Sequence, residues 1–299
     1  MIEIDWIEIP AGQFTCGISE KQVDLLLSRL PEHVDARQQQ WLRTKLLREA
    51  PERVVTIDRF YISRYPITNR QYLEFAYSNH RYSDSNVFSG QDRKTVLEGK
   101  QRLTEREGEH PTDSVWHSAL GFCDWIGARL PTSVEWEKAA RGTDGWLYPW
   151  GNTWDASRGN FTLDQKRRRT KTSAVNAYPS GQSPYGVMDM MGNMYEWTLS
   201  TMLGIGEISP QVITELVICR SCSCDFSMTD IPDWFRNRVT AIMGNEMYFG
   251  GAHLVGFRPV LDEWQRRCWP GLTQIANKSV GASGDFLADL LLGEINKND

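Results

Sequence analysis

The chain has 299 residues, of which 40% are hydrophobic and 24% are charged, with 12 tryptophans and a formal net charge of −5. This composition indicates a soluble globular protein with room for a large core, and the negative charge gives no general attraction to nucleic acid. No apolar run reaches the ~18 residues that a membrane helix needs, and the N-terminus lacks a basic start and an apolar signal core. We therefore expect a cytoplasmic protein without membrane or nucleic-acid partners.

The N-terminal part alternates between two kinds of pattern. Apolar and polar residues alternate in "IEIDWIEIPAGQFTCG", which predicts a hairpin of short strands turning at the "PAG" tripeptide. Residues 19–50 are charged, with Leu and Trp at helical spacing, and Pro31 predicts a division into two helices. Strand character returns in "RVVTIDRFYISRYPIT".

Three further helices are predicted from caps and spacing. The first covers 68–78 with Thr68 as N-cap, and the second covers 116–126. The third covers 132–141, where Thr132 and Glu135 form a capping box. The polar residues 80–109 have no clear period and predict a long surface excursion.

The C-terminal half is irregular in pattern. Residues 143–260 are rich in Gly, Asn, Pro and Trp, and their aromatic content favours ordered irregular structure over disorder. The organisation that follows is a domain over 1–261 with a helical insertion at 19–50, and an appendage over 262–299. The appendage ends in a predicted amphipathic helix, whose apolar residues are Phe286, Leu287, Leu290, Leu291 and Ile295.

Several blocks occur in an order that is typical of one family. They are "IPAGQFTCG", "FYISRYPITNRQYLEF", "HPTDSVWHSALGFCDWIGARLPTSVEWEKAARG", "YPWGN", "YGVMDMMGNMYEWT" and "GFRPV". Over about 4–260 the chain resembles the formylglycine-generating enzyme family, also called sulfatase-modifying factor. The resemblance implies an α+β, C-type lectin-like fold with little regular secondary structure. The family includes copper-dependent oxidases, iron-dependent sulfoxide synthases and non-catalytic binding proteins, some of them diversified or part of bacterial conflict systems, so the fold leaves the function open.

The resemblance predicts no copper site of the oxidase type in this chain. In the oxidases two cysteines hold Cu(I) through soft thiolates, and their positions fall here on Phe226 and Ile231, which bind no copper. The nearby cysteines of "CRSCSCDF" follow a C-x₂-C-x-C spacing that lacks the pairing of a structural zinc site. The residue-level reading favours packing as small apolar side chains. A metal or redox centre at Cys222 and Cys224, and with it a copper- or thiol-dependent oxidoreductase, stays the alternative. The iron branch is not favoured, because the five histidines show no ligand pairing.

The resemblance also implies a structural calcium site at "DMMGNMYEW". By position its ligands are the Asp189 side chain, the Gly192 and Met194 carbonyls, and Glu196, and hard oxygen ligands of this kind suit Ca²⁺. A second family site beginning at Asn160 is expected to be lost, because the loop that follows it is basic. Arg258 lies in the family strand "GFRPV". It is expected to be structural and to connect loops through the hydrogen bonds of its guanidinium.

Two surfaces are candidates for partner binding. The segment 225–255 occupies the family's functional position and is rich in Met and aromatic residues, which suits protein recognition. Its candidate contact residues are Trp234, Phe235, Met247, Tyr248 and Phe249. A basic loop, formed by Lys166, Arg167, Arg168, Arg169 and Lys171, is a candidate patch for an acidic partner, although no aromatic residues interleave with it. The preferred hypothesis is a non-catalytic recognition module with a protein partner.

Overall fold

The computed structural model describes residues 2–47, 49, 51–78, 93–161, 171–201, 217–220, 243–244 and 255–263. The helices are α1 (Glu20–Ser28), α2 (Ala36–Leu47), α3 (Asn69–Ser78), α4 (Arg93–Glu107), α5 (Trp116–Trp125) and α6 (Ser133–Arg141), with short 3₁₀ turns at Ala156–Arg158 and Pro179–Gly181. The strands are β1 (Trp6–Ile9), β2 (Gly12–Cys16), β3 (Arg53–Ile57), β4 (Phe60–Ser63), β5 (Tyr195–Thr201), β6 (Val217–Arg220), β7 (Met243–Gly244), β8 (Val255–Gly256) and β9 (Val260–Asp262). This is the expected mixed α+β fold with limited regular structure. The predicted amphipathic helix of the appendage lies outside the described residues.

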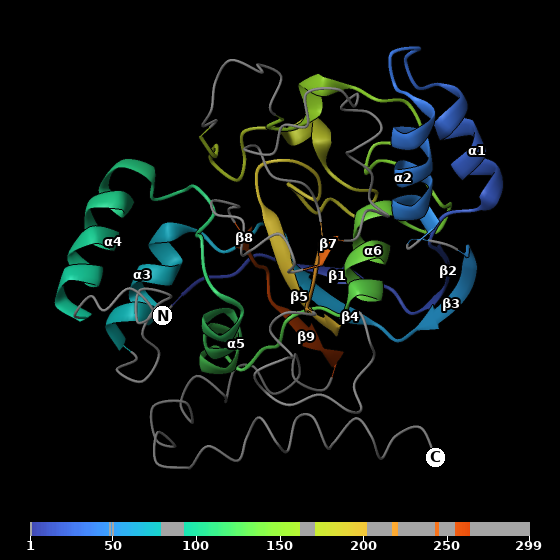
Figure 1. The fold of residues 1–299 in the computed structure, drawn as a ribbon. Coiled ribbons are helices and arrows are strands. Elements are labelled where there is room, and N and C mark those ends of the chain that lie inside the picture. The colour runs from blue at the N-terminus through green and yellow to red at the C-terminus, as the bar shows by residue number, and fades with distance from the viewer. Residues whose placement is uncertain are drawn as a thin grey trace.

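The strands form three small sheets, which Figure 1 shows at the centre of the molecule and at its rim. Their orders are β1-β4-β9, β2-β3 and β7-β6-β5-β8. All strand pairs are antiparallel except β5 and β8, which run parallel. Since β4 pairs with both β1 and β9, the beginning and the end of the described chain meet in one sheet.

The predicted N-terminal hairpin is wrong. β1 and β2 both form, but β1 pairs with β4 while β2 pairs with β3. Between them the chain turns from one sheet into another, and Gly12 takes a φ of +126° at this corner. The ammonium group of Lys138 donates to the carbonyls of Pro10 (2.7 Å) and Gly12 (2.9 Å). A buried cation therefore stabilises the corner, which a pattern of alternating residues does not reveal.

The three helices predicted over 68–78, 116–126 and 132–141 are confirmed as α3, α5 and α6. The side chain of Thr132 accepts from the Glu135 backbone and the Glu135 carboxylate accepts from the Thr132 backbone, so a capping box starts α6. Thr68 and Gln71 make the same pair of contacts at the start of α3. α5 begins at Trp116 without a side-chain cap. Each of these helices directs apolar residues into the core.

The predicted surface excursion over 80–109 contains a helix that the sequence pattern did not indicate, α4. This helix packs beside α3 (Figure 1) and is mostly polar. The Lys100 ammonium lies 4.5 Å from the centre of the Tyr72 ring, and the Tyr77 hydroxyl donates to Gln101 at 2.8 Å. Contacts of this kind hold the helix although its own apolar pattern is weak.

Residues 19–50 contain two helices on either side of Pro31, as predicted. Ser19 and Gln22 form a capping box at the start of α1. The Ile18 N–H donates to the Glu49 carbonyl at 3.1 Å, so the insertion begins and ends at one point. Its apolar side chains join the core cluster of the rest of the chain; they are Val23, Leu26, Val34, Leu42 and Leu46. None of the described helices combines the length and the apolar character needed to cross a membrane.

Candidate functional site

The sheet β7-β6-β5-β8 carries both ends of the candidate binding segment. The chain leaves this sheet at Arg220, the last residue of β6, and returns at Val255, the first residue of β8. β6 and β8 lie on opposite sides of β5. Between these ends, β7 pairs with β6 and holds the segment at a third point. The predicted contact residues Trp234, Phe235, Met247, Tyr248 and Phe249 lie outside the described residues.

The buried carboxylate of Glu137 anchors Arg220, the residue at which the segment leaves the sheet. Glu137 of α6 accepts through Oε1 from the Gly17 backbone N–H (2.7 Å) and from Nη1 of Arg141 (2.8 Å). Its Oε2 accepts from Nη2 of Arg220 (2.5 Å) and from the thiol of Cys16 (3.5 Å). Burial disfavours the charged carboxylate, but Arg220 and Arg141 outweigh it and hold the pKa of Glu137 below its ordinary value. We call this group the Glu137 clamp.

A second buried ion pair, between Arg258 and Glu196, anchors the chain just after the segment returns to the sheet. Nε and Nη2 of Arg258 donate to the two oxygens of Glu196 at 2.7 and 2.6 Å. The remaining N–H groups of Arg258 donate to the carbonyls of Ser63 (3.1 Å), Arg64 (3.2 Å) and Met188 (2.9 Å). All five guanidinium donors are therefore used. The prediction that Arg258 ties loops together is confirmed, and we call this group the Glu196 clamp.

Trp136 connects the two clamps. Its indole N–H donates to Oε2 of Glu196 at 2.7 Å, and the guanidinium carbon of Arg220 lies 5.3 Å from the centre of its ring. Trp136 is completely buried, as are Arg220 and Arg258. The base beneath the segment is therefore one connected set of buried charges and one aromatic ring, with little freedom to rearrange.

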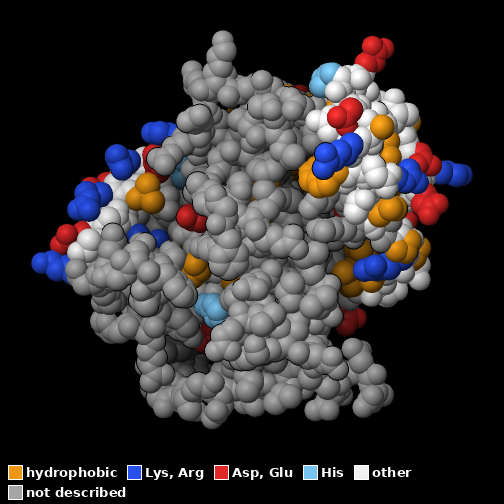
Figure 2. Space-filling model, in the orientation of Figure 1, with side chains coloured by type: hydrophobic (Ala, Val, Ile, Leu, Met, Phe, Trp, Pro, Cys, Tyr) orange, Lys and Arg blue, Asp and Glu red, His pale blue; other side chains and the backbone are white. Residues whose placement is uncertain are grey.

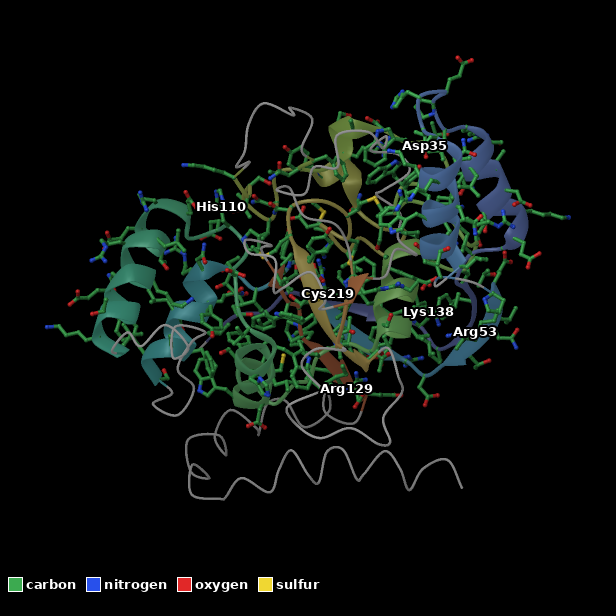
Figure 3. The ribbon with its side chains drawn as sticks, viewed as in Figure 1. Asp35, Arg53, His110, Arg129, Lys138 and Cys219 are labelled. Atoms are coloured by element: carbon green, nitrogen blue, oxygen red, sulfur yellow. The ribbon has the colours of Figure 1, made fainter. Side chains whose placement is uncertain are left out.

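The described cysteines are core residues. Cys16, Cys123 and Cys219 are buried free thiols, and burial raises the pKa of each thiol. Cys219 lies in β6 opposite Trp197 of β5, and Figure 3 shows it in the centre of the molecule. A thiol in such a place is neither a ready nucleophile nor a ready metal ligand. The prediction of packing is confirmed for Cys219, whereas Cys222 and Cys224 lie outside the described residues.

The predicted calcium ligands lie in the turn before β5 and at the start of β5, and three of them have other partners. Both oxygens of Glu196 receive the Arg258 fork, and the Gly192 carbonyl accepts from the Met194 N–H at 2.7 Å. Oδ2 of Asp189 accepts from the side chain of Asn193 at 2.9 Å. In this arrangement Glu196 fits a guanidinium and not a calcium ion. Calcium at these four positions stays a prediction that the observed contacts do not favour.

Asn160, where the second calcium site of the family would begin, also has protein partners. The Asn160 side-chain amide donates to the Lys171 carbonyl (2.9 Å) and to Oδ1 of Asn193 (3.2 Å). The Lys171 side chain is 84% exposed, and its Nζ lies 3.8 Å from Oε1 of Glu107. The other residues of the basic loop, Lys166, Arg167, Arg168 and Arg169, lie outside the described residues. Across the described part of the chain, no three His, Cys, Asp or Glu side chains are grouped as metal ligands would be.

Most of the buried contacts that form the two clamps were not predicted from the sequence. Glu137 and Arg141 stand four residues apart on α6, a spacing typical of an intrahelical ion pair, so this contact had a readable signal. The contacts of Glu137 with Gly17 and Arg220 span 120 and 83 residues, and the sequence carries no local sign of them. Lys138 and Trp136 were missed for the same reason.

Taken together, the small sheets, the irregular connections and the buried clamps define an α+β protein of the formylglycine-generating-enzyme fold. Residues 3–261 match the family described as "Sulfatase-modifying factor enzyme 1-like domain", and the chain belongs to this family.

Relatives with different activities share this fold. The chain is 33% identical over 281 residues to inactive C-alpha-formylglycine-generating enzyme 2 of Bos taurus, covering 81% of this chain and 83% of the relative. It is 29% identical over 234 residues to formylglycine-generating enzyme of Mus musculus, covering 64% and 57%. The crystal structure of CarF superposes with a TM-score of 0.53 at 17% identity, over 88% of this chain and 100% of CarF. The comparisons therefore establish the family and leave catalysis undetermined.

Proposed function

We propose that this chain is a non-catalytic recognition domain whose segment 221–254 binds a protein ligand. The observation that carries the proposal is that both ends of the segment are locked to one sheet. Arg220 at its start belongs to the Glu137 clamp, and Arg258, three residues beyond Val255, belongs to the Glu196 clamp. A rigid base of this kind allows the residues between the clamps to vary in contact with a ligand while the fold stays unchanged.

Further observations support binding over oxidation. By the family resemblance, Phe226 and Ile231 fall at the positions of the copper-binding cysteines of the oxidases. The buried Cys219 thiol supplies no substitute ligand, since burial disfavours its thiolate. A relative that is matched over 83% of its length also carries the word "inactive" in its name. The aromatic residues of the segment, with Met247, suit a protein surface.

The test is alanine substitution at Trp234, Tyr248 and Phe249, one at a time. The ligand would first be captured from the native host with the wild-type chain, identified and purified, so that its Kd can be measured. We expect at least one variant to lose ~2 kcal/mol or more of binding free energy with its melting temperature nearly unchanged. A loss of ~3–5 kcal/mol of folding stability in all three variants would show that the rings are core residues and would contradict the proposal.

The competing function is a copper- or thiol-dependent oxidoreductase at Cys222 and Cys224. Metal analysis and thiol titration of the purified chain separate the two functions. Stoichiometric copper that is lost on Cys222→Ser would overturn the binding proposal, whereas copper-free protein that still binds its ligand is the result we expect.

A further inference from the structure

β3 is the outer strand of the two-stranded sheet. Within the described residues it pairs only with β2, and Figure 1 shows both strands at the rim of the molecule beside α1 and α2. Arg53, the first residue of β3, is labelled at this rim in Figure 3. An edge strand presents a row of backbone N–H and C=O groups to its surroundings.

The register tells which backbone groups face outward. In an antiparallel pair, successive residues direct their N–H and C=O groups alternately toward the partner strand and away from it. The Thr15 N–H donates to the Thr143 carbonyl (3.5 Å), so Thr15 faces away from β3. Its neighbour Phe14 therefore faces β3, where its partner is Val55. On β3, the residues before and after Val55 must then direct their N–H and C=O groups to the free edge.

Those two residues are Val54 and Thr56, and their side chains are exposed as well. Val54 is 67% exposed, the largest value among the exposed large hydrophobic residues of the described chain. Most of these residues belong to the same part of the molecule, formed by α1, α2 and β3, where Figure 2 shows hydrophobic side chains at the surface. They are Leu25, Trp41, Leu47 and Val54. β3 also contains no proline that would block another strand, and its one charged residue, Arg53, stands at its first position.

The charges at the ends of β3 decide what kind of strand fits. Glu52 and Asp58 flank the strand, are exposed, and share the face of Val54 and Thr56 because side chains alternate with a period of two. This face therefore has an apolar or β-branched centre and a carboxylate at each end. A second copy of the chain in the fully overlapped antiparallel register would place Glu52 opposite Asp58 of the other copy, which is repulsive.

We propose that the free edge of β3 is a docking site for an extended strand of another protein, with β-branched residues at its centre and a basic residue at each end of the same face. The backbone groups of Val54 and Thr56 supply the main-chain hydrogen bonds, and Glu52 and Asp58 select the basic ends. This site is formed by residues other than segment 221–254 and does not depend on the function proposed for that segment.

The probe is the capped synthetic peptide Lys-Thr-Val-Thr-Val-Glu-Lys with a fluorescent label, and the measurement is its anisotropy on titration with the full-length chain. We expect saturable binding to the wild type. Val54→Pro removes an outward N–H at a position where an edge strand tolerates proline, so binding should fall by about tenfold or more at an unchanged melting temperature. Thr56→Pro should act in the same way. The matched control Val54→Thr keeps the N–H and the β-branched shape and should stay within about threefold of the wild type.

Charge reversal tests the selectivity. The double variant Glu52→Lys, Asp58→Lys should bind the probe about tenfold more weakly and should prefer the reversed peptide Glu-Thr-Val-Thr-Val-Lys-Glu. Absence of saturable binding to the wild type, or equal binding by Val54→Pro and Thr56→Pro variants that fold normally, would overturn the proposal. A wild type that dimerises and becomes monomeric on Val54→Pro would also overturn it, because the occupant would then be a second copy.

Discussion

At the scale of single residues, two buried carboxylates stand out in the described part of the chain. Glu137 and Glu196 are each almost completely inaccessible, and each pairs with guanidinium. Removing one member of such a pair leaves an uncompensated charge in the core, which costs more than the pair itself contributes.

Arg258→Lys should therefore destabilise the fold strongly although it preserves the charge. The fork that meets both oxygens of Glu196 would be replaced by a single ammonium group with three donors. We expect the free energy of unfolding to fall by ~3 kcal/mol or more, measured by urea denaturation. Arg64→Lys is the matched control, because Arg64 pairs with Asp5 at a half-exposed site and should change stability by less than ~1 kcal/mol. Equal effects of the two substitutions would contradict a special role for the Glu196 clamp.

Asp189 should make the stability of the ion-free protein depend on pH. Burial raises the pKa of its carboxyl to about 7, although Asn193 and Arg258 act in the opposite direction. The unfolded value is near ~3.9. The folded chain therefore holds the proton more tightly, so the stabilising contribution is complete below about pH 4 and is lost as the pH rises through about 7.

Asp189→Asn should abolish that loss. The left-handed φ of +54° suits asparagine, so little strain is expected from the substitution. In calcium-free buffer we expect the variant to match the wild type near pH 4 and to exceed its free energy of unfolding by ~4 kcal/mol at pH 8, because a pKa difference of about three units corresponds to about 1.4 kcal/mol per unit. The exposed Asp144→Asn is the control and should leave the slope unchanged. Calcium that stabilises the wild type but not Asp189→Asn would instead place the ion at this residue.

At the residue scale, the sequence predicted contacts that depend on local chemistry. The structural role of Arg258 could be anticipated from its family block and from the geometry of a guanidinium. The Glu137 clamp could not, because its members come from β2, α6 and β6. Their meeting depends on the three-dimensional arrangement of elements that are far apart in the chain.

At the scale of elements, local sequence signals predicted most helices correctly but did not predict which strands pair with each other. Thr132 and Glu135 are three residues apart, so their capping box is visible in the sequence. The partner of β1 is more than 50 residues away in β4, and nothing near the "PAG" turn distinguishes that pairing from a hairpin. α4 was missed because it is polar and because Gly99 interrupts its helical pattern.

Gly99→Ala should stabilise α4. The glycine lies within the helix, and a Cβ atom added there meets nothing within 4 Å. Alanine reduces the conformational freedom of the unfolded chain without a clash, so we expect a gain of ~0.5–1 kcal/mol in the free energy of unfolding.

Gly17→Ala is the opposing control. Gly17 has a φ of +85°, and a Cβ atom would lie 2.7 Å from the Glu49 carbonyl oxygen and 2.9 Å from that of Pro51. This variant should be clearly destabilised. A loss of stability in Gly99→Ala would contradict the helix over 93–107.

At the scale of the whole molecule, the inserted helices behave as part of the fold. Val23, Leu42 and Leu46 belong to the same core cluster as Phe122 and Trp136. The insertion is also closed at its base by the Ile18–Glu49 hydrogen bond. An excursion joined in both ways should not open independently of the rest.

Native-state hydrogen exchange tests this. The amides of α1 and α2 that lie in the core should be protected to a free energy close to that of α5 and α6. Protection that is lower by several kcal/mol, with exchange from local opening, would show that the insertion is a separate unit. Coincident melting of helical circular dichroism and tryptophan fluorescence would agree with the single-unit result.

The β1-β4-β9 sheet determines when the chain can fold. β4 pairs at Phe60 with Asp262, and Arg258 donates to the Ser63 carbonyl across 195 residues. During synthesis, β1 and β4 must therefore wait for nearly the whole described chain before their sheet is complete. Such long-range closure predicts slow folding and a nascent chain that exposes apolar strands for much of its translation. Production of this protein should accordingly respond to chaperones and growth temperature more than its folded stability would suggest.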